Sequence, residues 1–360
     1  MSTPREDGFF MPAEWAPHAG TWMIWPERTD NWRLGAKPAQ AAFTAVASAI
    51  ARYEPVTMMV SAKQFSHARR CLPGAVRVVE ISSNDAWARD VGASFLVNGQ
   101  GELRGVDWPF NAWGGVHGGL YFPWDLDDAV AAKMLQLERA KAYRAPAVIE
   151  GGAIHVDGEG TVLVTEACLL DENRNPGATR QEIERVLKDY LGASQVIWLG
   201  EEVPHDETGG HIDNIACFVR PGVVALSWCD DPADPHYKVS RDAETRLLAA
   251  RDAKGRSITV VHIPMPSPLF FEAEEAAGID QTAAGMSRQA GERLAASYIN
   301  FYFANGAIIA PMFHVETDAA AQRILTDLFP EHDVIMIPAR EILLGGGNIH
   351  CITQQQPRFG

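Results

Sequence analysis

A local pattern recurs along this chain: an amphipathic helix followed closely by a short apolar strand. In residues 179–199, apolar side chains such as Ile183, Leu187 and Leu191 fall at helical spacing, and the strand-like run QVIWL follows. Thr179 has the spacing of a capping box with the glutamate three residues later, and a glycine stands where the helix should stop. This segment therefore predicts a helix with both ends defined by sequence.

The same helix-to-strand pattern appears at four other places: residues 39–60, 64–81, 241–263 and 319–337. The spacing of these units is irregular, which argues against a solenoid with a fixed period. Repeated alternation instead predicts α/β layers with partly parallel strands, on which ligands bind beyond the strand ends. No linker, low-complexity tract or charge block marks a boundary, so we expect residues 1–360 to form a single catalytic domain.

Net charge, hydropathy and cysteine spacing restrict the classes of partner, location and structural site that this chain can have. The formal net charge of −15 disfavours nucleic acid and anionic membranes and is compatible with a cationic ligand, although it also serves plain solubility. No run approaches the ~18 apolar residues of a membrane helix, and the first residues do not resemble a secretion signal, so we expect a cytoplasmic protein. Five irregularly spaced cysteines without a CxxC pair argue against a disulfide framework and a structural zinc knuckle.

Glycine pairs stand beside polar residues in three places: GGAIH at 151–155, GGHID at 209–213 and GGNIH at 346–350. Glycine permits a positive φ and close backbone approach, so these stretches predict three loops that converge on one site. Three ordinary tight turns are the alternative.

The thiol that stands out is Cys351, in the glycine-framed stretch that ends with it. A thiolate nucleophile needs help, because at its ordinary pKa only a few per cent of the thiol is ionised at neutral pH. Candidate bases, acids and orienting carboxylates lie beside apparent strand ends: His211 with Asp213, Glu150 with His155 and Asp157, and Asp90. Each also has an ordinary interpretation: Cys351 as packing, Arg89 and Asp90 as a surface ion pair, His350 as a core histidine bonded to a carbonyl, and Trp87 as packing rather than a pocket wall.

A surplus of carboxylates around one thiol favours a cationic substrate with an electrophilic carbon. A guanidinium fits, since it is planar and pairs bidentately with carboxylates. Two carboxylates would hold its nitrogens, the thiolate would attack the central carbon, and a histidine would protonate the departing ammonia and then activate water. Such chemistry requires no metal and no organic cofactor.

At this point the chain resembles the agmatine deiminases, in the guanidino-group-modifying family that also contains bacterial peptidylarginine deiminases. The similarity covers nearly the whole sequence. The segments that carry it are MPAEWAPHAGTWMIWP (11–26), NDAWARDVGASFLV (84–97), EGGAIHVDGEGTVLVTEACLLDENRNP (150–176), GGHIDNIACFVRPGVVALSW (209–228), RLAASYINFYFANGAIIAP (293–311) and GGGNIHCITQQQP (345–357).

The resemblance implies an α/β fold, a five-bladed pseudo-symmetric propeller of the pentein type built from repeated αβ modules around a central site. It implies hydrolysis of agmatine to N-carbamoylputrescine and ammonia through a covalent thiouronium intermediate, in arginine-to-putrescine polyamine metabolism, by a protein expected to be a homodimer. The family's nucleophile falls on Cys351, its general acid and base on His211, and the glutamate paired with that histidine on Glu150. Its guanidinium-binding carboxylates fall on Asp90 and Asp213.

Other details complete these expectations. Trp87 is expected to wall the substrate pocket, and the segment HDETGG at 205–210 is expected to lie over the far end of the substrate. Relatives often have a proline after the glycine of the RDxG segment, where this chain has Gly92 followed by Ala93. We expect that difference to have a local effect only.

Two other classes of function stay open at the level of sequence. His155, Asp157, His211, Asp213 and Glu150 are acceptable zinc or manganese ligands if they converge, as in a metallohydrolase. A chelator would abolish metal chemistry and leave thiol chemistry intact. A polyamine-binding protein that kept the pocket and lost catalysis would bind agmatine without releasing ammonia.

Overall fold

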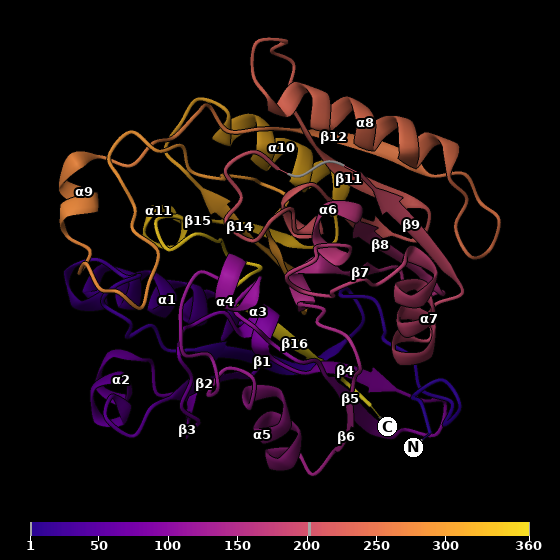
Figure 1. Ribbon diagram of the computed structural model, residues 1–360, viewed down its shortest axis with the longest axis horizontal. Helices are drawn as coiled ribbons and strands as arrows, with labels where there is room; N and C mark the ends of the chain where they lie inside the picture. Colours follow the sequence, from indigo (N-terminus) through magenta and orange to yellow (C-terminus); the bar gives the residue numbers. More distant parts are fainter. Residues whose placement is uncertain (1, 201–202, 360) are drawn as a thin grey trace.

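The computed structural model describes residues 2–200 and 203–359, and these residues form five small β-sheets arranged as the blades of a pseudo-symmetric propeller (Figure 1). The expected α/β propeller is confirmed. In every sheet an antiparallel pair of strands is followed by a parallel strand, and a helix connects the two parallel strands. The repeating unit is thus strand, strand, helix, strand.

Four sheets have three strands each. The first comprises β4 (Ser94–Val97), β5 (Leu103–Asp107), α5 (Val130–Leu137) and β6 (Lys141–Arg144). The second comprises β7 (His155–Val156), β8 (Thr161–Thr165), α7 (Arg180–Leu191) and β9 (Gln195–Leu199). The third comprises β10 (Ala216–Arg220), β11 (Val223–Trp228), α8 (His236–Ala249) and β12 (Thr259–Pro264). The fourth comprises β13 (Tyr302–Ala304), β14 (Ala307–Met312), α10 (Asp318–Leu328) and β15 (Asp333–Pro338).

The remaining sheet joins the two ends of the chain. It comprises β16 (Gln354–Pro357), β1 (His18–Ile24), α1 (Lys37–Ile50), β2 (Val56–Val60), α2 (Phe65–Cys71) and β3 (Arg77–Glu80). Strand β16 pairs antiparallel with β1, with Trp22 opposite Gln354, and takes the place that the first strand holds in the other sheets. Pairing between the first and last strands therefore closes the ring of blades.

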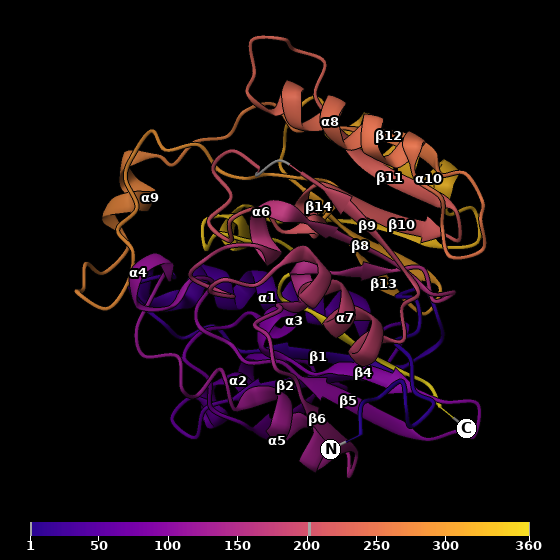
Figure 2. The same ribbon diagram turned by 45° about the vertical axis from the view of Figure 1, so that its right-hand side comes forward.

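The longer helices lie on the outside of the sheets, and the short helices lie within the connections between other elements. Figures 1 and 2 show α5, α7 and α8 on the outer faces of their blades. The short helices are η1 (Leu34–Ala36), α3 (Ala88–Val91), α4 (Gly115–Gly118), η2 (Gly151–Ala153), α6 (Glu166–Leu169), η3 (Ile212–Asn214), α9 (Ala273–Ala277) and α11 (Arg340–Leu343). Across the described ranges, no helix is both long and apolar enough to cross a membrane.

A short turn or helix precedes the first strand of each sheet, and this is what positions the candidate site. Helix α3 comes just before β4, η2 before β7 and η3 before β10. Turns at residues 298–299 and 349–352 hold the equivalent places before β13 and β16. Because the blades are related by pseudo-symmetry, these five connections converge at the centre of the molecule.

Local sequence signals explain much of this fold. The helix predicted after Thr179 is α7: the Thr179 hydroxyl accepts the Glu182 backbone N–H at 3.3 Å, and the Glu182 carboxylate accepts the Thr179 N–H at 2.9 Å. Gly192 ends the helix with φ of 71°. Strands β2 and β8 are buried along their whole length, which explains their continuous apolar runs.

All five predicted helix-to-strand units are present, but they do not map one to a blade. The units at 39–60 and 64–81 belong to the same sheet, and the unit formed by α5 and β6 was not predicted. Strand β6 buries only Tyr143 among its four residues, so the apolar run that marks the other strands is missing there.

The capping box of α7 generates a stability prediction. Replacing Thr179 with alanine removes the hydroxyl that accepts the Glu182 N–H, whereas the backbone N–H of residue 179 stays, and we expect the free energy of unfolding to fall by about 1 kcal/mol. Urea denaturation followed by circular dichroism measures this. The matched control is Thr245→Ala in α8, where the hydroxyl bonds only the Arg241 carbonyl one turn back and its loss should cost little. Equal effects of the two substitutions would contradict the assigned cap.

Candidate active site

The structure brings the predicted site residues together at the centre of the propeller. Asp90 lies in α3, Glu150 immediately before η2, His211 and Asp213 at η3, and Cys351 just before β16. Each comes from the connection that precedes the first strand of its sheet, and each is at most 4% exposed. The pseudo-symmetric fold therefore delivers four separate segments to one place.

Gly152 marks the point on which three of these side chains converge. A Cβ at this position would lie 2.5 Å from His211 Nδ1, 2.8 Å from Asp90 Oδ1 and 3.0 Å from Asp213 Oδ2. Only glycine leaves that space open. At the other side, a Cβ at Gly347 would lie 2.5 Å from the Trp87 ring and 3.1 Å from Cys351 Cβ. Two of the predicted glycine loops thus border the site through close backbone approach.

His211 stands between two carboxylates. Its Nδ1 is 3.9 Å from Asp90 Oδ1, and its Nε2 is 3.6 Å from Glu150 Oε2. Burial opposes a charge on the ring, but the neighbouring Asp90, with further contributions from the nearby Cys168 and Glu150, outweighs it and raises the pKa of His211 well above its ordinary value. The ring is therefore an imidazolium at neutral pH, able to donate a proton.

Glu150 stays ionised because a buried arginine holds it. Arg174 Nε donates to Glu150 Oε1 at 2.9 Å, and the same guanidinium also donates to the Thr208 carbonyl. Burial alone would raise the pKa of Glu150, but Arg174 and then His211 lower it to about 2. Arg174 was not singled out from the sequence, although it lies within the quoted segment 150–176.

Asp213 belongs to a buried chain of charges that the sequence did not reveal. His350 Nδ1 donates to Asp213 Oδ2 at 2.8 Å, and its Nε2 donates to Glu14 Oε1 at 2.9 Å. Glu14 also accepts from Arg89 Nη1 at 3.2 Å. Two interpretations from the sequence were wrong. His350 bonds carboxylates rather than a carbonyl, and Arg89 is not part of a surface ion pair with Asp90. His350 and Arg89 are both buried partners of Glu14.

Asp90 is the carboxylate with the least support from cations. It accepts the Trp113 indole N–H at 3.0 Å and the Gly152 N–H at 2.9 Å, both from neutral donors. Burial raises its pKa to about 6; the charge of His211 opposes this shift, and Asp213 and Glu150 add to it. This carboxylate has the electrostatic capacity to accept a further cation.

Cys351 lies beside Asp213, with 3.6 Å between Sγ and Oδ2. Asn300, from the turn before β13, places Nδ2 3.3 Å from the sulfur and accepts the His350 backbone N–H at 3.0 Å. Burial, and then the charges of Asp213 and Asp90, raise the pKa of the Cys351 thiol well above its ordinary value. A cation bound between the carboxylates would reverse that electrostatic contribution.

A pocket opens onto Cys351 and Asp90, and Trp87 forms part of its wall. Further from the sulfur, the lining includes apolar side chains and the carboxylates of Asp30 and Glu207. Glu207 belongs to the segment 205–210 and pairs with Arg288, whose Nε is 2.9 Å from Oε1. Arg28 pairs with Asp30 in the same way, and both arginines also line the pocket, so this part of the lining combines apolar side chains with ion pairs.

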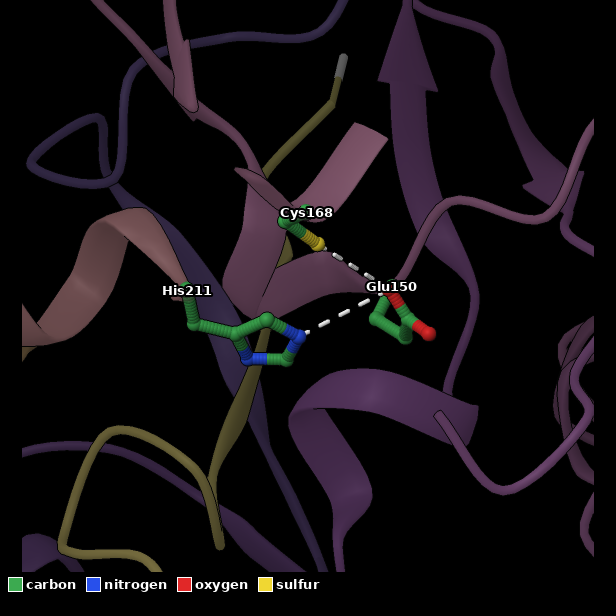
Figure 3. Close-up of side chains that lie close together, drawn as sticks. All are labelled: Glu150, Cys168 and His211. Carbon is green, nitrogen blue, oxygen red and sulfur yellow. Dashed lines mark hydrogen bonds and ion pairs between the residues drawn. The ribbon is translucent and has the colours of Figure 1, made fainter. Parts of the chain in front are cut away.

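The metal ligands considered from the sequence do not all converge. His155 Nδ1 accepts the Phe218 N–H at 3.2 Å, and Asp157 accepts backbone N–H groups of its own turn. In the described part of the chain, one group of three side chains brings its donor atoms within 4.8 Å of one another: Glu150, Cys168 and His211 (Figure 3). Cys168 was not singled out from the sequence.

Comparison with known proteins agrees with this geometry. The chain is 58% identical over 358 residues to agmatine deiminases of Ectopseudomonas mendocina and Pseudomonas putida, covering 99% of this chain and 97% of each relative. Its structure is similar to that of an agmatine deiminase of Enterococcus faecalis, with a TM-score of 0.97 and 47% identity over 99% of this chain and 98% of that chain. Residues 10–357 match the Porphyromonas-type peptidyl-arginine deiminase family, and the chain belongs to that family.

Proposed function

We propose that this protein is an agmatine deiminase, a hydrolase that converts agmatine and water into N-carbamoylputrescine and ammonia. One observation carries the proposal from the structure: Cys351 and Asp90 line one pocket, and His211 and Asp213 lie directly beside them. The agmatine deiminases that this chain resembles along its full length support the same activity. We expect it to serve putrescine formation.

Substrate binding is proposed to depend on the carboxylates. Asp90 and Asp213 would accept hydrogen bonds from the guanidinium and bring its central carbon toward Cys351 Sγ, while Trp87 limits the pocket beside it. Each charge-assisted bond contributes roughly 1.5–3 kcal/mol. The positive charge would also lower the pKa of the adjacent thiol and favour the thiolate in the complex, with its proton leaving to solvent.

The chemical steps then follow from the charge states of the free site. The Cys351 thiolate attacks the guanidinium carbon to form a neutral tetrahedral species, and His211 gives its proton to the departing nitrogen, so that ammonia leaves and a thiouronium cation remains on sulfur. Neutral His211 next takes a proton from water as the water attacks the same carbon. Breakage of the carbon–sulfur bond releases N-carbamoylputrescine and regenerates the thiol.

Glu150 and Arg174 are proposed to act through His211. Glu150 remains anionic because Arg174 pairs with it, and its charge stabilises the imidazolium form of His211. Nε2 faces Glu150, so Nδ1, which faces the open space at Gly152, is the atom that would exchange protons with substrate and water.

We propose that the substrate is a decarboxylated amine. Leu120, Tyr121 and Met286 line the pocket and suit a short methylene chain. Asp30 pairs with Arg28 and Glu207 with Arg288, so their charges are offset, and the preference for agmatine over free arginine rests on the agmatine deiminases that this chain resembles. Beyond the site, we propose that residues 1–360 act as a single catalytic domain in a cytoplasmic homodimer; residues 1, 201, 202 and 360 lie outside the described part of that span.

Ammonia release tests the proposed function directly. Purified protein is given agmatine, arginine or an arginyl peptide, with and without prior alkylation by iodoacetamide. We expect release from agmatine only, abolished by alkylation and unaffected by a chelator. Activity on arginine would change the assigned substrate to arginine. Activity lost to a chelator would favour a metallohydrolase. Agmatine binding without ammonia release would indicate a binding protein.

Replacement of the nucleophile separates chemistry from binding. Cys351→Ala should lower kcat by at least about 10⁴-fold, because no other group can form the covalent intermediate. Calorimetry should show agmatine affinity within a few-fold of the unmodified protein. The control is Cys71→Ala, which removes an exposed thiol and should leave turnover unchanged. Substantial turnover by Cys351→Ala would rule out the covalent route.

Loss of a guanidinium-binding carboxylate should weaken binding itself. In the Cys351→Ala background, Asp90→Asn is expected to raise the Kd for agmatine roughly 10- to 150-fold, which corresponds to one charge-assisted bond. Asp327→Asn changes the same net charge at an exposed position of α10 and is the matched control. Unchanged affinity after Asp90→Asn would remove Asp90 from the binding site.

Agmatine affinity should also depend on pH through Asp90. Its pKa of about 6 means that the carboxylate is charged above that pH and becomes neutral as pH falls through it. We therefore expect the affinity of Cys351→Ala for agmatine to drop about tenfold per pH unit below 6. The double variant Cys351→Ala, Asp90→Asn should lack this dependence. The same acid limb in both variants would assign it to another group.

A further inference from the structure

Behind His211, on the side away from Gly152, a second cluster of reactive groups is buried. Cys168 in α6 points its sulfur toward Glu150, with 3.8 Å between Sγ and Oε2, and His211 Nε2 lies 3.6 Å from the same oxygen (Figure 3). All three side chains are at most 1% exposed. The proposed reaction gives no role to the thiol of Cys168.

We propose that Glu150, Cys168 and His211 form a binding site for a thiophilic divalent cation of the Zn²⁺ type, and that occupation of this site inhibits the enzyme. The donor set contains one thiolate, one imidazole and one carboxylate, which are the three ligand types that zinc takes from proteins. Metal binding itself does not depend on the proposed function, whereas the inhibition rests on it.

The spacing of the donor atoms fits such an ion. Zinc bonds of about 2.0 Å to oxygen, 2.1 Å to nitrogen and 2.3 Å to sulfur, directed tetrahedrally, separate neighbouring donors by roughly 3.3–3.5 Å. The observed separations of 3.6 Å and 3.8 Å from Glu150 Oε2 exceed those values by a few tenths of an ångström. All three donor atoms lie within 4.8 Å of one another, so the side chains would have to close around the ion to complete three bonds, with the fourth position left for water.

The hydrogen bonding of the cluster also leaves its donor atoms available. His211 Nε2 is buried without a hydrogen-bond partner among the described residues. Glu150 receives Arg174 on Oε1, so Oε2 remains directed toward the ring and the thiol. A buried, unsatisfied nitrogen beside a carboxylate oxygen, whose partner in the cluster is the long contact from the Cys168 thiol, is a polar arrangement that a metal ion would satisfy.

Proton balance sets the pH dependence of binding. Coordination displaces one proton from the Cys168 thiol and one from Nε2 of the His211 imidazolium, and no electron is transferred. The resulting thiolate and the Glu150 carboxylate offset the two positive charges of the ion. Because both protons must leave before these atoms can coordinate the ion, affinity should increase as pH rises.

Inhibition follows from coordination of the metal by Nε2 of His211. His211 must alternate between imidazolium and imidazole, but a ring with metal on Nε2 has only Nδ1 left. Its proton exchange would then run between imidazole and imidazolate, which is unfavourable near neutral pH.

Direct binding is tested first, without reliance on activity. The protein carries Cys351→Ala, to remove the reactive thiol as a ligand, and Cys71→Ser, because exposed Cys71 Sγ lies 3.6 Å from His67 Nε2. Titration with Co²⁺ should give one equivalent of binding with a thiolate-to-cobalt absorption band. Adding Cys168→Ala, or separately Glu150→Gln, should abolish the band or weaken binding by at least about 10- to 100-fold. No band in the parent, or an unchanged band without Cys168, would overturn the site.

Activity is tested next in the Cys71→Ser enzyme, which should retain full turnover. Zn²⁺ should inhibit ammonia release from agmatine, and a chelator should restore it, the reverse of the response of a metalloenzyme. Cys168→Ala, compared with its own zinc-free rate, should need at least about 10-fold more Zn²⁺ for half inhibition. Equal sensitivity would place the inhibitory ion on Cys351 and overturn the proposal. Cobalt binding without ammonia release in any protein would refute the proposed function alone.

Discussion

The charge balance at the centre of the propeller governs the rest of this structure. Glu14, Glu150 and Asp213 are buried, and each has a cationic partner within hydrogen-bond distance: Arg89 and His350 for Glu14, Arg174 for Glu150, and His350 for Asp213. Asp90 has neutral donors instead, and its pKa of about 6 reflects that shortage. Asp90 is thus the carboxylate of this group without a charged hydrogen-bond partner, and a guanidinium can take that place while it also promotes ionisation of the thiol.

Topology explains how so many charges reach one place. In each blade the chain enters through a short connection before the first strand, and five equivalent connections meet at the pseudo-symmetry axis. Such an arrangement brings backbones close together, so it requires residues without a Cβ at Gly152 and Gly347. The glycines next to the functional residues are therefore consequences of convergence, and the same turns that build the fold also build the site.

The sequence was informative where the signal is local or where long motifs match a known family. The capping box of α7 and the apolar runs of the parallel strands follow from neighbouring residues, and the resemblance located Cys351 and His211. The charge network was not predictable in this way, because His350 and Glu14 are 336 residues apart and their pairing leaves no local pattern. Strand β6 was missed for a different reason: three of its four residues are exposed, so the strand carries no apolar run.

The position of the thiol near the end of the chain becomes understandable from the closure of the ring. Residues just after Cys351 form β16, which pairs with β1, and β1 in turn pairs with the fully buried β2. Gln354 Nε2 donates to the Ala93 carbonyl at 2.7 Å, which ties β16 to the segment that follows Asp90. A terminal strand that frayed would release Cys351 from Asp213 and Asn300 together. Because the pairing of that strand with β1 closes the ring of blades, the proposed nucleophile is held by the same pairing that completes the fold.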